Sequence, residues 1–184
     1  MPPQVNSEIL SRASRVRLVL MDVDGVLTDG KYFHVPNPQG GLFEVKLFDS
    51  QDGIALQWLH QAGIKTGVIS GRDAESTRER ARSSHMAYCY MGNTEKLPIF
   101  EEILADSGLP AGQIAYIGDD LTDAILMRRV GLAVAVANAA PEVKAMAHYV
   151  TAAPGGSGAV REATELILAA QGRWEQILRH YEVI

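Results

Sequence analysis

The sequence lacks the features of a disulfide-stapled or membrane-spanning protein. Cys89 is the single cysteine among 184 residues, which excludes a disulfide within the chain, and we expect its thiol to be buried and structural. No apolar run approaches the roughly 20 residues that a membrane span needs. The first fifteen residues lack the apolar centre of a signal peptide. We therefore expect a cytoplasmic protein that does not bind membranes.

The chain also lacks a surplus of basic residues. Its 17 Lys and Arg residues face 22 Asp and Glu residues, which gives a formal net charge of −5. Proteins bind nucleic acids and anionic membranes mainly through surplus positive charge, so neither is expected as the main partner. A small anionic substrate is still compatible with this charge, because it needs only a few local cations.

Short apolar runs alternate with helical patterns along most of the chain. The apolar runs predict strands at residues 16–21, 64–69, 87–91, 114–117 and 132–136. The segments between them predict helices at residues 52–62, 73–84, 94–107, 121–129 and 141–147. This alternation predicts an α/β fold with a doubly wound parallel sheet and right-handed crossovers.

Two segments depart from this alternation within what we predict to be a single domain over residues 1–184. Residues 29–48 read as two strands, 31–35 and 42–47, around a turn rich in Pro and Gly, which predicts a β-hairpin inserted after the first strand. Ligands bind at the carboxyl ends of parallel strands, so we interpret the hairpin as a lid or an oligomer contact, with an inert loop as the alternative. Residues 153–184 form a tail that we expect to dock on a neighbouring subunit, with a flexible Gly-rich link at 153–162 and two short amphipathic helices at 163–170 and 174–181.

Polar residues follow the first four predicted strands. They are Asp22 and Asp24 after the first, Ser70, Gly71 and Arg72 after the second, Lys96 at the start of the helix after the third, and Asp119, Asp120 and Asp123 after the fourth. Because the carboxyl ends of parallel strands meet at one edge of the sheet, we expect these residues to surround one site.

The acidic residues among them predict a metal site. Carboxylates a few ångströms apart repel one another, and a hard divalent cation relieves that repulsion. Oxygen ligands without His or Cys favour Mg²⁺ over Zn²⁺. We expect Asp22, Asp24 and Asp119 to bind Mg²⁺, with a contact from the backbone carbonyl of Asp24, and Asp120 and Asp123 to support them.

A carboxylate beside Mg²⁺ and a lysine suits phosphoryl transfer through an aspartyl-phosphate. Asp22 is the predicted nucleophile, because it is the first polar residue after a buried strand. Asp24 is predicted to protonate the leaving alcohol and then to deprotonate the attacking water. We expect Lys96 and Ser70, with backbone N–H groups, to hold the phosphate. A solvated turn explains a lone pair of acids, but it does not explain polar residues after four successive strands.

Four motifs resemble those of the haloacid dehalogenase superfamily in order and spacing, over nearly the whole chain. They are "DVDGVLTDG", "VISGR", Lys96 in "GNTEK", and "GDDLTD". The hairpin, "FDSQDG" and "GGSGAVRE" resemble its capless subclass, in particular the 3-deoxy-D-manno-octulosonate 8-phosphate phosphatase family. The resemblance implies a Rossmann-like fold and a Mg²⁺-dependent homotetramer that hydrolyses a sugar-acid phosphate in lipopolysaccharide biosynthesis. It also implies that Arg72 or Arg80 binds the sugar carboxylate, and that Arg161 touches the sugar acid or closes the pocket of a neighbouring subunit.

Several alternatives stay open at this point. The substrate could be a nine-carbon sugar-acid phosphate, or the chain could be a general small-metabolite phosphatase. A non-enzymatic receiver module also combines Asp, Mg²⁺, Ser or Thr, and Lys on a doubly wound sheet, but it takes its phosphorylated Asp from a later strand. For Arg80 and Arg161, the alternative is a surface ion pair.

Overall fold

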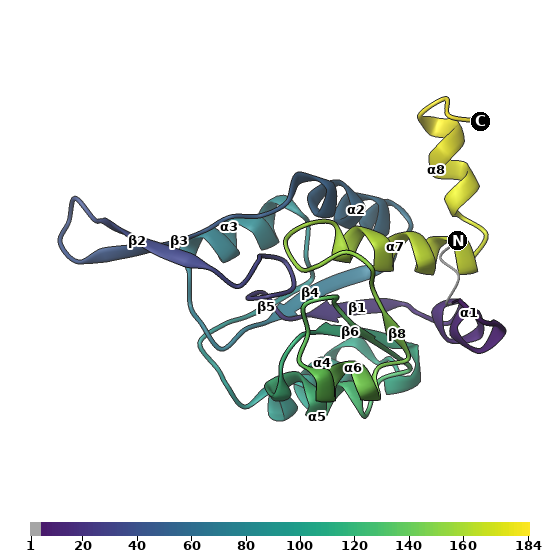
Figure 1. The fold of residues 1–184 in the computed structure, drawn as a ribbon, viewed down its shortest axis with the longest axis horizontal. Coiled ribbons are helices and arrows are strands. Elements are labelled where there is room, and N and C mark those ends of the chain that lie inside the picture. The colour runs from purple at the N-terminus through teal and green to yellow at the C-terminus, as the bar shows by residue number, and fades with distance from the viewer. Residues whose placement is uncertain (1–4) are drawn as a thin grey trace.

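A six-stranded parallel sheet lies at the centre of the computed structural model, which describes residues 5–184 (Figure 1). The strand order is β5-β4-β1-β6-β7-β8, and every pairing is parallel. The strands are β1 (Leu18–Met21), β4 (Lys65–Ile69), β5 (Tyr88–Tyr90), β6 (Ile114–Gly118), β7 (Leu132–Ala135) and β8 (Tyr149–Val150). The chain winds outward in opposite directions from β1 and β6, and ligands bind at such a switch point in open α/β sheets. The predicted doubly wound α/β fold is confirmed.

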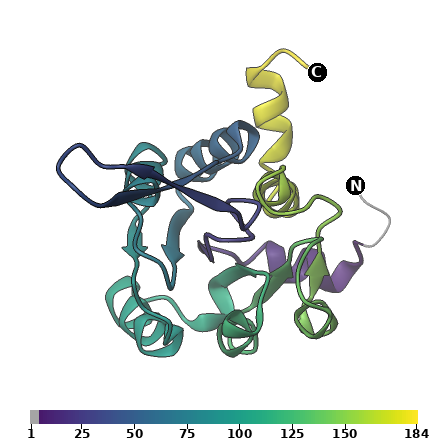
Figure 2. The same ribbon diagram turned by 60° about the vertical axis from the view of Figure 1, so that its left-hand side comes forward.

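Helices cover both faces of the sheet, as Figures 1 and 2 show. One face carries α2 (Ser50–Gln61), α3 (Glu75–Ser83) and α7 (Ala159–Ala170), with α1 (Ser7–Ala13) beside α7. The other carries α4 (Lys96–Ser107), α5 (Ala124–Met127) and α6 (Pro141–Met146), with short 3₁₀ helices at Ala111–Gln113 and Leu121–Asp123. All four residues of β1 are buried, as expected for a strand covered on both faces.

The hairpin is a separate two-stranded antiparallel sheet of β2 (Tyr32–Pro36) and β3 (Leu42–Lys46). It projects from the body of the molecule at the left of Figure 1, and its base lies next to α3. Its large apolar side chains are exposed, namely Tyr32, Phe33, Leu42, Phe43 and the following Leu47. The predicted insertion after the first strand is confirmed.

The structure differs from the sequence-based expectations in several places. Cys89 is exposed rather than buried, because β5 is the outermost strand of the sheet. The predicted helix 121–129 is split into the 3₁₀ turn Leu121–Asp123 and α5. The strand β8 was not predicted, since two residues are too few for a pattern. The N-terminal arm is helical from Ser7 to Ala13, and its first four residues lie outside the described part of the chain.

The C-terminal tail also differs from the prediction. It continues as α7 and then α8 (Trp174–His180), which stands away from the sheet at the upper right of Figure 1. Helix α7 begins at Ala159 rather than at residue 163, and Ala159, Val160 and Ala163 are buried in the core. None of the helices between residues 5 and 184 has the length and apolar character needed to cross a bilayer.

Candidate active site

The candidate site begins with Asp22 at the carboxyl end of β1. Its N–H group donates to the carbonyl oxygen of Ile117 in β6 at 3.0 Å, so the backbone is still fixed to the sheet at this residue. Its Oδ1 atom accepts the N–H group of Val23 at 2.7 Å and lies 3.2 Å from Lys96 Nζ. The residue is 9% exposed. Burial and the nearby Asp123 raise the pKa of Asp22 to about 6, against the opposing effect of Lys96.

Lys96, the first residue of α4, lies between two carboxylates. Its Nζ atom donates to Asp123 Oδ1 at 2.7 Å and to the hydroxyl of Tyr116 at 3.2 Å, and it lies close to Asp22. Burial acts to lower the pKa of Lys96, but the charges of Asp22 and Asp123 outweigh burial and raise it. Lys96 therefore carries a fixed positive charge at the base of the site.

Asp123 is fully buried, and its carboxylate is saturated with hydrogen bonds. Oδ1 accepts from Lys96 and, at 2.7 Å, from the hydroxyl of Tyr116. Oδ2 accepts the N–H groups of Asp119 at 2.9 Å and Asp120 at 3.2 Å. This side chain fixes the loop that carries Asp119. Asp120 is exposed, and its carboxylate caps the 3₁₀ turn by accepting the N–H group of Leu121.

Asp119 has a carboxylate oxygen that no hydrogen bond accounts for. Within residues 5–184, Oδ1 of Asp119 is buried and without a hydrogen-bond partner. Burial, followed by the charges of Asp123 and Asp22, raises the pKa of Asp119 to about 7. A Cβ atom on Gly25, whose φ is +90°, would lie 2.1 Å from Asp119 Oδ2, so only glycine leaves room there.

These carboxylates fit a hard divalent cation. Oxygen atoms of Asp22, Asp119 and Asp123 lie within 4.8 Å of one another. Four donors already occupy Asp123, whereas Asp119 presents an unpartnered oxygen that is costly to bury alone. Asp22 and Asp119 are therefore the side chains best suited to hold Mg²⁺, with Asp123 fixing the loop behind them.

Asp24 pairs with a lysine of the hairpin and is not part of the acidic cluster of Asp22, Asp119 and Asp123. Lys46 Nζ, from the end of β3, lies 2.7 Å from each of its two carboxylate oxygens. The structure therefore does not bring the Asp24 carboxylate to the metal-binding oxygens, and the contact through its backbone carbonyl stays a prediction. No motif singles out Lys46, which has the pattern of an ordinary polar residue in an alternating strand.

A small cavity opens beside these residues. Its volume is about 140 Å³, and its lining residues are Asp22, Asp24, Gly71, Arg72, Thr94, Lys96 and Thr122. Ser70 follows β4 and is buried, and its hydroxyl oxygen accepts the N–H group of Arg72 at 3.2 Å. The cavity is far smaller than a typical pocket for a whole metabolite. Its size and its Lys96 suit a phosphate group, with the rest of a substrate lying outside.

Arg72 joins the mouth of this cavity to the hairpin. Its guanidinium donates to Glu44 at 3.1 Å and to the hydroxyl of Tyr32 at 2.7 Å, and it lies 4.0 Å from the centre of the Tyr32 ring. The residue pattern did not single out Tyr32, Glu44 or Tyr116, which lie in strands outside the motifs. Thr94 and Thr122 lie within "GNTEK" and "GDDLTD", but only the charged residues of these motifs were predicted to act.

Arg80 and Arg161 lie outside the cavity of their own chain. Arg80 packs on the Phe48 ring and donates to the carbonyl oxygen of Asp49 at 3.3 Å. Arg161 lies 5.0 Å from the Trp58 ring and pairs with Glu165 at 2.8 Å. Arg161 lines a separate cavity of about 360 Å³ at the junction of α2, α7 and α8. Neither residue lines the cavity beside Asp22 and Lys96, and their contacts with a sugar acid stay predictions.

The Gly-rich segment before α7 supports the loop that follows Asp24. The N–H group of Gly155 donates to Asn138 Oδ1 at 2.6 Å, and Asn138 Nδ2 donates to the carbonyl oxygen of Gly25 at 3.1 Å. The N–H group of Gly156 donates to the carbonyl oxygen of Val26 at 2.9 Å. A Cβ atom on Gly155 would lie 1.8 Å from the Gly25 carbonyl oxygen. The segment therefore contributes to the geometry of the site within its own chain.

Asp52 anchors the start of α7 behind this segment. It is 1% exposed, and its carboxylate accepts the N–H groups of Arg161 at 2.8 Å and Gly158 at 3.4 Å. Burial, the largest effect, raises the pKa of Asp52 to about 6, although these hydrogen bonds oppose the shift. The ionised carboxyl group is therefore less favourable in the folded chain than in the unfolded chain.

This pKa predicts that Asp52 makes the folded protein less stable as pH rises. The unfolded carboxyl group ionises from about pH 4 and the folded one near pH 6, so the free energy of unfolding falls by up to about 3 kcal/mol between these values. Asp52→Asn keeps an acceptor for the helix but removes the charge. In urea unfolding with EDTA, the stability of wild type relative to the variant should decline from about pH 4.5 to about pH 7 and then level off. Parallel stability curves for the two proteins would exclude this role.

Comparisons with known proteins identify relatives of this chain. A family model described as haloacid dehalogenase-like hydrolase matches residues 83–162. The 3-deoxy-D-manno-octulosonate 8-phosphate phosphatase KdsC of Yersinia pestis is 42% identical over 171 residues, which cover 93% of this chain and 89% of that protein. The KdsC protein of Escherichia coli K12 is 37% identical over 172 residues, which cover 94% of this chain and 89% of that one.

Solved structures give the same result. The crystal structure of 3-deoxy-D-manno-octulosonate 8-phosphate phosphatase from Moraxella catarrhalis, in complex with a magnesium ion, a phosphate ion and a KDO molecule, matches with a TM-score of 0.89 and 36% identity. The match covers 96% of this chain and 99% of that one. The Yersinia pestis enzyme matches with a TM-score of 0.87 at 42% identity, over 93% of this chain and 90% of that one.

Proposed function

Because the chain belongs to the haloacid dehalogenase-like hydrolases, we propose that it is a Mg²⁺-dependent 3-deoxy-D-manno-octulosonate 8-phosphate phosphatase. Its KdsC relatives are 37–42% identical to it in sequence. One observation carries the chemistry: a buried carboxylate, Asp22, lies 3.2 Å from Lys96 and within 4.8 Å of Asp119, beside a phosphate-sized cavity. The Moraxella catarrhalis structure, which holds magnesium, phosphate and KDO, supports the substrate and the metal.

The proposed reaction begins at the free oxygen of Asp22. Asp22 Oδ1 accepts the N–H group of Val23 and pairs with Lys96, so the other oxygen of Asp22, Oδ2, is free to attack the phosphorus atom. The bond from phosphorus to the sugar oxygen breaks, and Asp24 gives its proton to that oxygen. Asp24 then accepts a proton from water, which attacks the aspartyl-phosphate and releases phosphate and the Asp22 carboxylate.

Fixed positive charge supports both steps. Lys96 is buried against Asp22, where its charge offsets the negative charge of a bound phosphate. Mg²⁺ held by Asp22 and Asp119 supplies further positive charge when it is bound. The backbone N–H group of Gly71 and the Ser70 hydroxyl lie after β4, at the same edge of the sheet, where they can donate to phosphate oxygens.

We further propose that the protein is a homotetramer. The exposed apolar side chains of the hairpin support an interface there, because such a patch is unusual on a monomer surface. Arg161 pairs with Glu165 outside the cavity of its own chain, which leaves the proposed contact with a neighbouring subunit's substrate open to it. The cytoplasm stays the predicted compartment.

A substrate screen tests the proposed function. The purified protein should release phosphate from 3-deoxy-D-manno-octulosonate 8-phosphate with Mg²⁺ and should lose this activity with EDTA. If only a nine-carbon sugar-acid phosphate is turned over well, the proposed substrate is wrong but the proposed mechanism still holds. Comparable rates on many unrelated phosphate esters would indicate a general phosphatase. A stable phosphorylated protein that never turns over would indicate a receiver module.

A further inference from the structure

A buried lysine of the hairpin, Lys46, forms an ion pair with Asp24, the residue that we propose as general acid and base. Lys46 is the last residue of β3, and its side chain is 0% exposed. Its Nζ atom lies 2.7 Å from both oxygens of Asp24. We infer that Lys46 is a positioning residue that holds Asp24 for proton transfer, so that the hairpin forms part of the catalytic machinery. This inference rests on the proposed phosphatase function.

The contacts of Lys46 connect it to Asp24 rather than to the nucleophile. Within residues 5–184, the ion pairs of its Nζ atom are with Asp24 and, at 3.4 Å, with Glu44. Asp22 is paired with a different lysine, Lys96, in the buried base of the site. The two catalytic carboxylates therefore have separate lysine partners, and a change at Lys46 acts first on Asp24.

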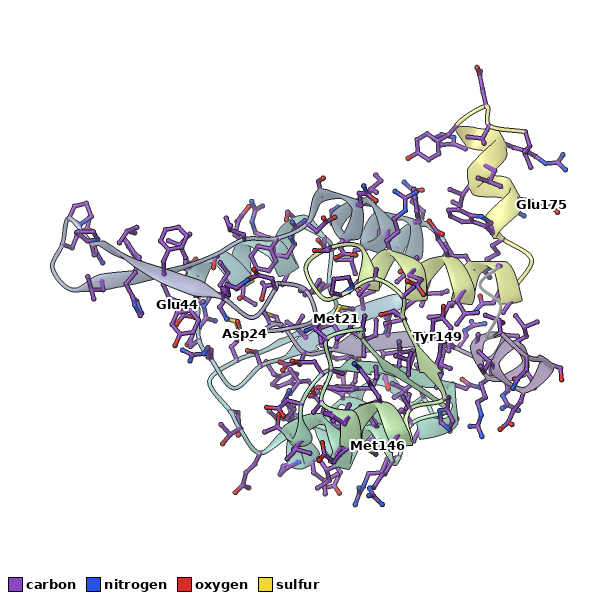
Figure 3. The ribbon with its side chains drawn as sticks, in the orientation of Figure 1. Met21, Asp24, Glu44, Met146, Tyr149 and Glu175 are labelled. Carbon is purple, nitrogen blue, oxygen red and sulfur yellow. The ribbon has the colours of Figure 1, made fainter. Side chains whose placement is uncertain are left out.

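A second set of contacts fixes Lys46 itself. Glu44 lies next to its Nζ atom and also pairs with Arg72 at 3.1 Å. Arg72 in turn donates to the hydroxyl of Tyr32, which lies opposite Lys46 in the hairpin. In Figure 3, Asp24 and Glu44 are labelled where the hairpin joins the body of the protein. Both hairpin strands are thus tied to Arg72 at the mouth of the cavity, and Lys46 has little freedom to turn away.

An anchor for the hairpin would not require a buried lysine. Removing an ammonium group from water is costly, and apolar residues of similar volume often stabilise a fold better than a buried ion pair does. Asp24, in contrast, needs a fixed orientation, because its carboxyl group must meet both the leaving oxygen and the attacking water. The two-oxygen contact with Lys46 supplies that orientation from a rigid strand rather than from a loop.

A pair of substrates with different leaving groups tests this role. A sugar phosphate releases an alkoxide that must be protonated, whereas p-nitrophenyl phosphate releases a weakly basic phenolate that leaves without the proton of Asp24. Lys46→Met should lower kcat for the sugar phosphate by about 100-fold. With p-nitrophenyl phosphate, the first step should survive and give a burst of phenolate equal to the enzyme concentration. Slow turnover should follow, because release of the aspartyl-phosphate still needs Asp24 to accept a proton from water.

Two further variants separate positioning from a structural effect. Lys31→Met is a matched control, since Lys31 also lies at the hairpin base and pairs with an aspartate, Asp29 at 2.8 Å, but is 85% exposed and outside the site. It should keep wild-type kinetics. In an Asp24→Asn background, Lys46→Met should cause no further loss, because Lys46 acts through Asp24. If Lys46→Met does not fold, Lys46→Gln gives the same comparison with a hydrogen-bonding side chain.

The outcomes distinguish this inference from the proposed function. Equal losses on both substrates without a burst, or additive losses with Asp24→Asn, would overturn the role of Lys46 and leave the phosphatase intact. A wild-type protein that hydrolyses neither ester would overturn the proposed function, and the role of Lys46 with it.

Discussion

Asp22→Asn is expected to lower kcat for the sugar-acid phosphate by at least about 10⁴-fold while leaving the protein folded. The amide cannot form an aspartyl-phosphate, and no other carboxylate takes the place of Asp22 at the end of β1. The pKa of Asp22 is raised to about 6 by burial and Asp123, so a neutral side chain of the same shape is well tolerated there. Phosphate release and thermal unfolding without metal, measured on the same samples, check both parts.

Asp29→Asn is the matched control for this variant. Asp29 lies on the same loop, but it is exposed and pairs with Lys31. Its removal should change kcat by less than about threefold, because a surface ion pair contributes little. Activity of Asp22→Asn within tenfold of wild type, with deamidation excluded by mass spectrometry, would mean that another group forms the bond to phosphorus.

Asp119→Asn is expected to raise the Mg²⁺ concentration for half-maximal activity by about 100-fold or more. The reason is the unpartnered, buried oxygen of Asp119, which lies near Asp22 and costs free energy unless a cation neutralises it. Without metal the same substitution should raise the melting temperature at neutral pH. Burial, Asp123 and Asp22 raise the pKa of Asp119 to about 7, so its ionised form is disfavoured in the fold.

Loss of metal affinity with a gain in metal-free stability is a pattern that simple misfolding does not produce. A Mg²⁺ titration of phosphate release and a thermal unfolding series with EDTA would reveal it. Asp120→Asn gives the comparison, because the exposed Asp120 carboxylate caps Leu121 and has no contact with Asp22. If both variants shifted the Mg²⁺ dependence equally, Asp119 would not be the principal ligand.

The sequence predicted the convergence of Asp22, Ser70, Lys96 and Asp119 because topology alone produces it. Once apolar strands alternate with helices, parallel pairing brings the residues after each strand to the same edge of the sheet. The same reasoning could not rank the acids of "GDDLTD". Asp120 reaches the surface and Asp123 the core because a 3₁₀ turn, rather than a longer helix, follows β6. That turn depends on the hydrogen bonds of Asp123, which form only after folding.

Contacts made by the hairpin and the tail were beyond sequence reasoning. The pairing of Asp24 with Lys46 depends on how the hairpin is oriented against the sheet, and local residue patterns do not determine this orientation. Tyr116 was read as one apolar residue of a strand, whereas its hydroxyl binds Lys96 and Asp123. Arg161 was expected in a flexible link. Arg161 lies in the first turn of α7. This helix begins before the predicted residue 163, because the Asp52 carboxylate accepts N–H groups at the start of the helix.

Trapping the covalent intermediate tests the central claim, that Asp22 is the nucleophile, most directly. The wild-type protein is mixed with 3-deoxy-D-manno-octulosonate 8-phosphate and Mg²⁺, quenched during turnover, and reduced with borohydride, which converts an aspartyl-phosphate to homoserine. Peptide mass spectrometry should find homoserine at position 22, and none in samples without substrate. Homoserine at Asp119 or Asp120 instead, or rapid turnover with no reducible intermediate, would contradict the account.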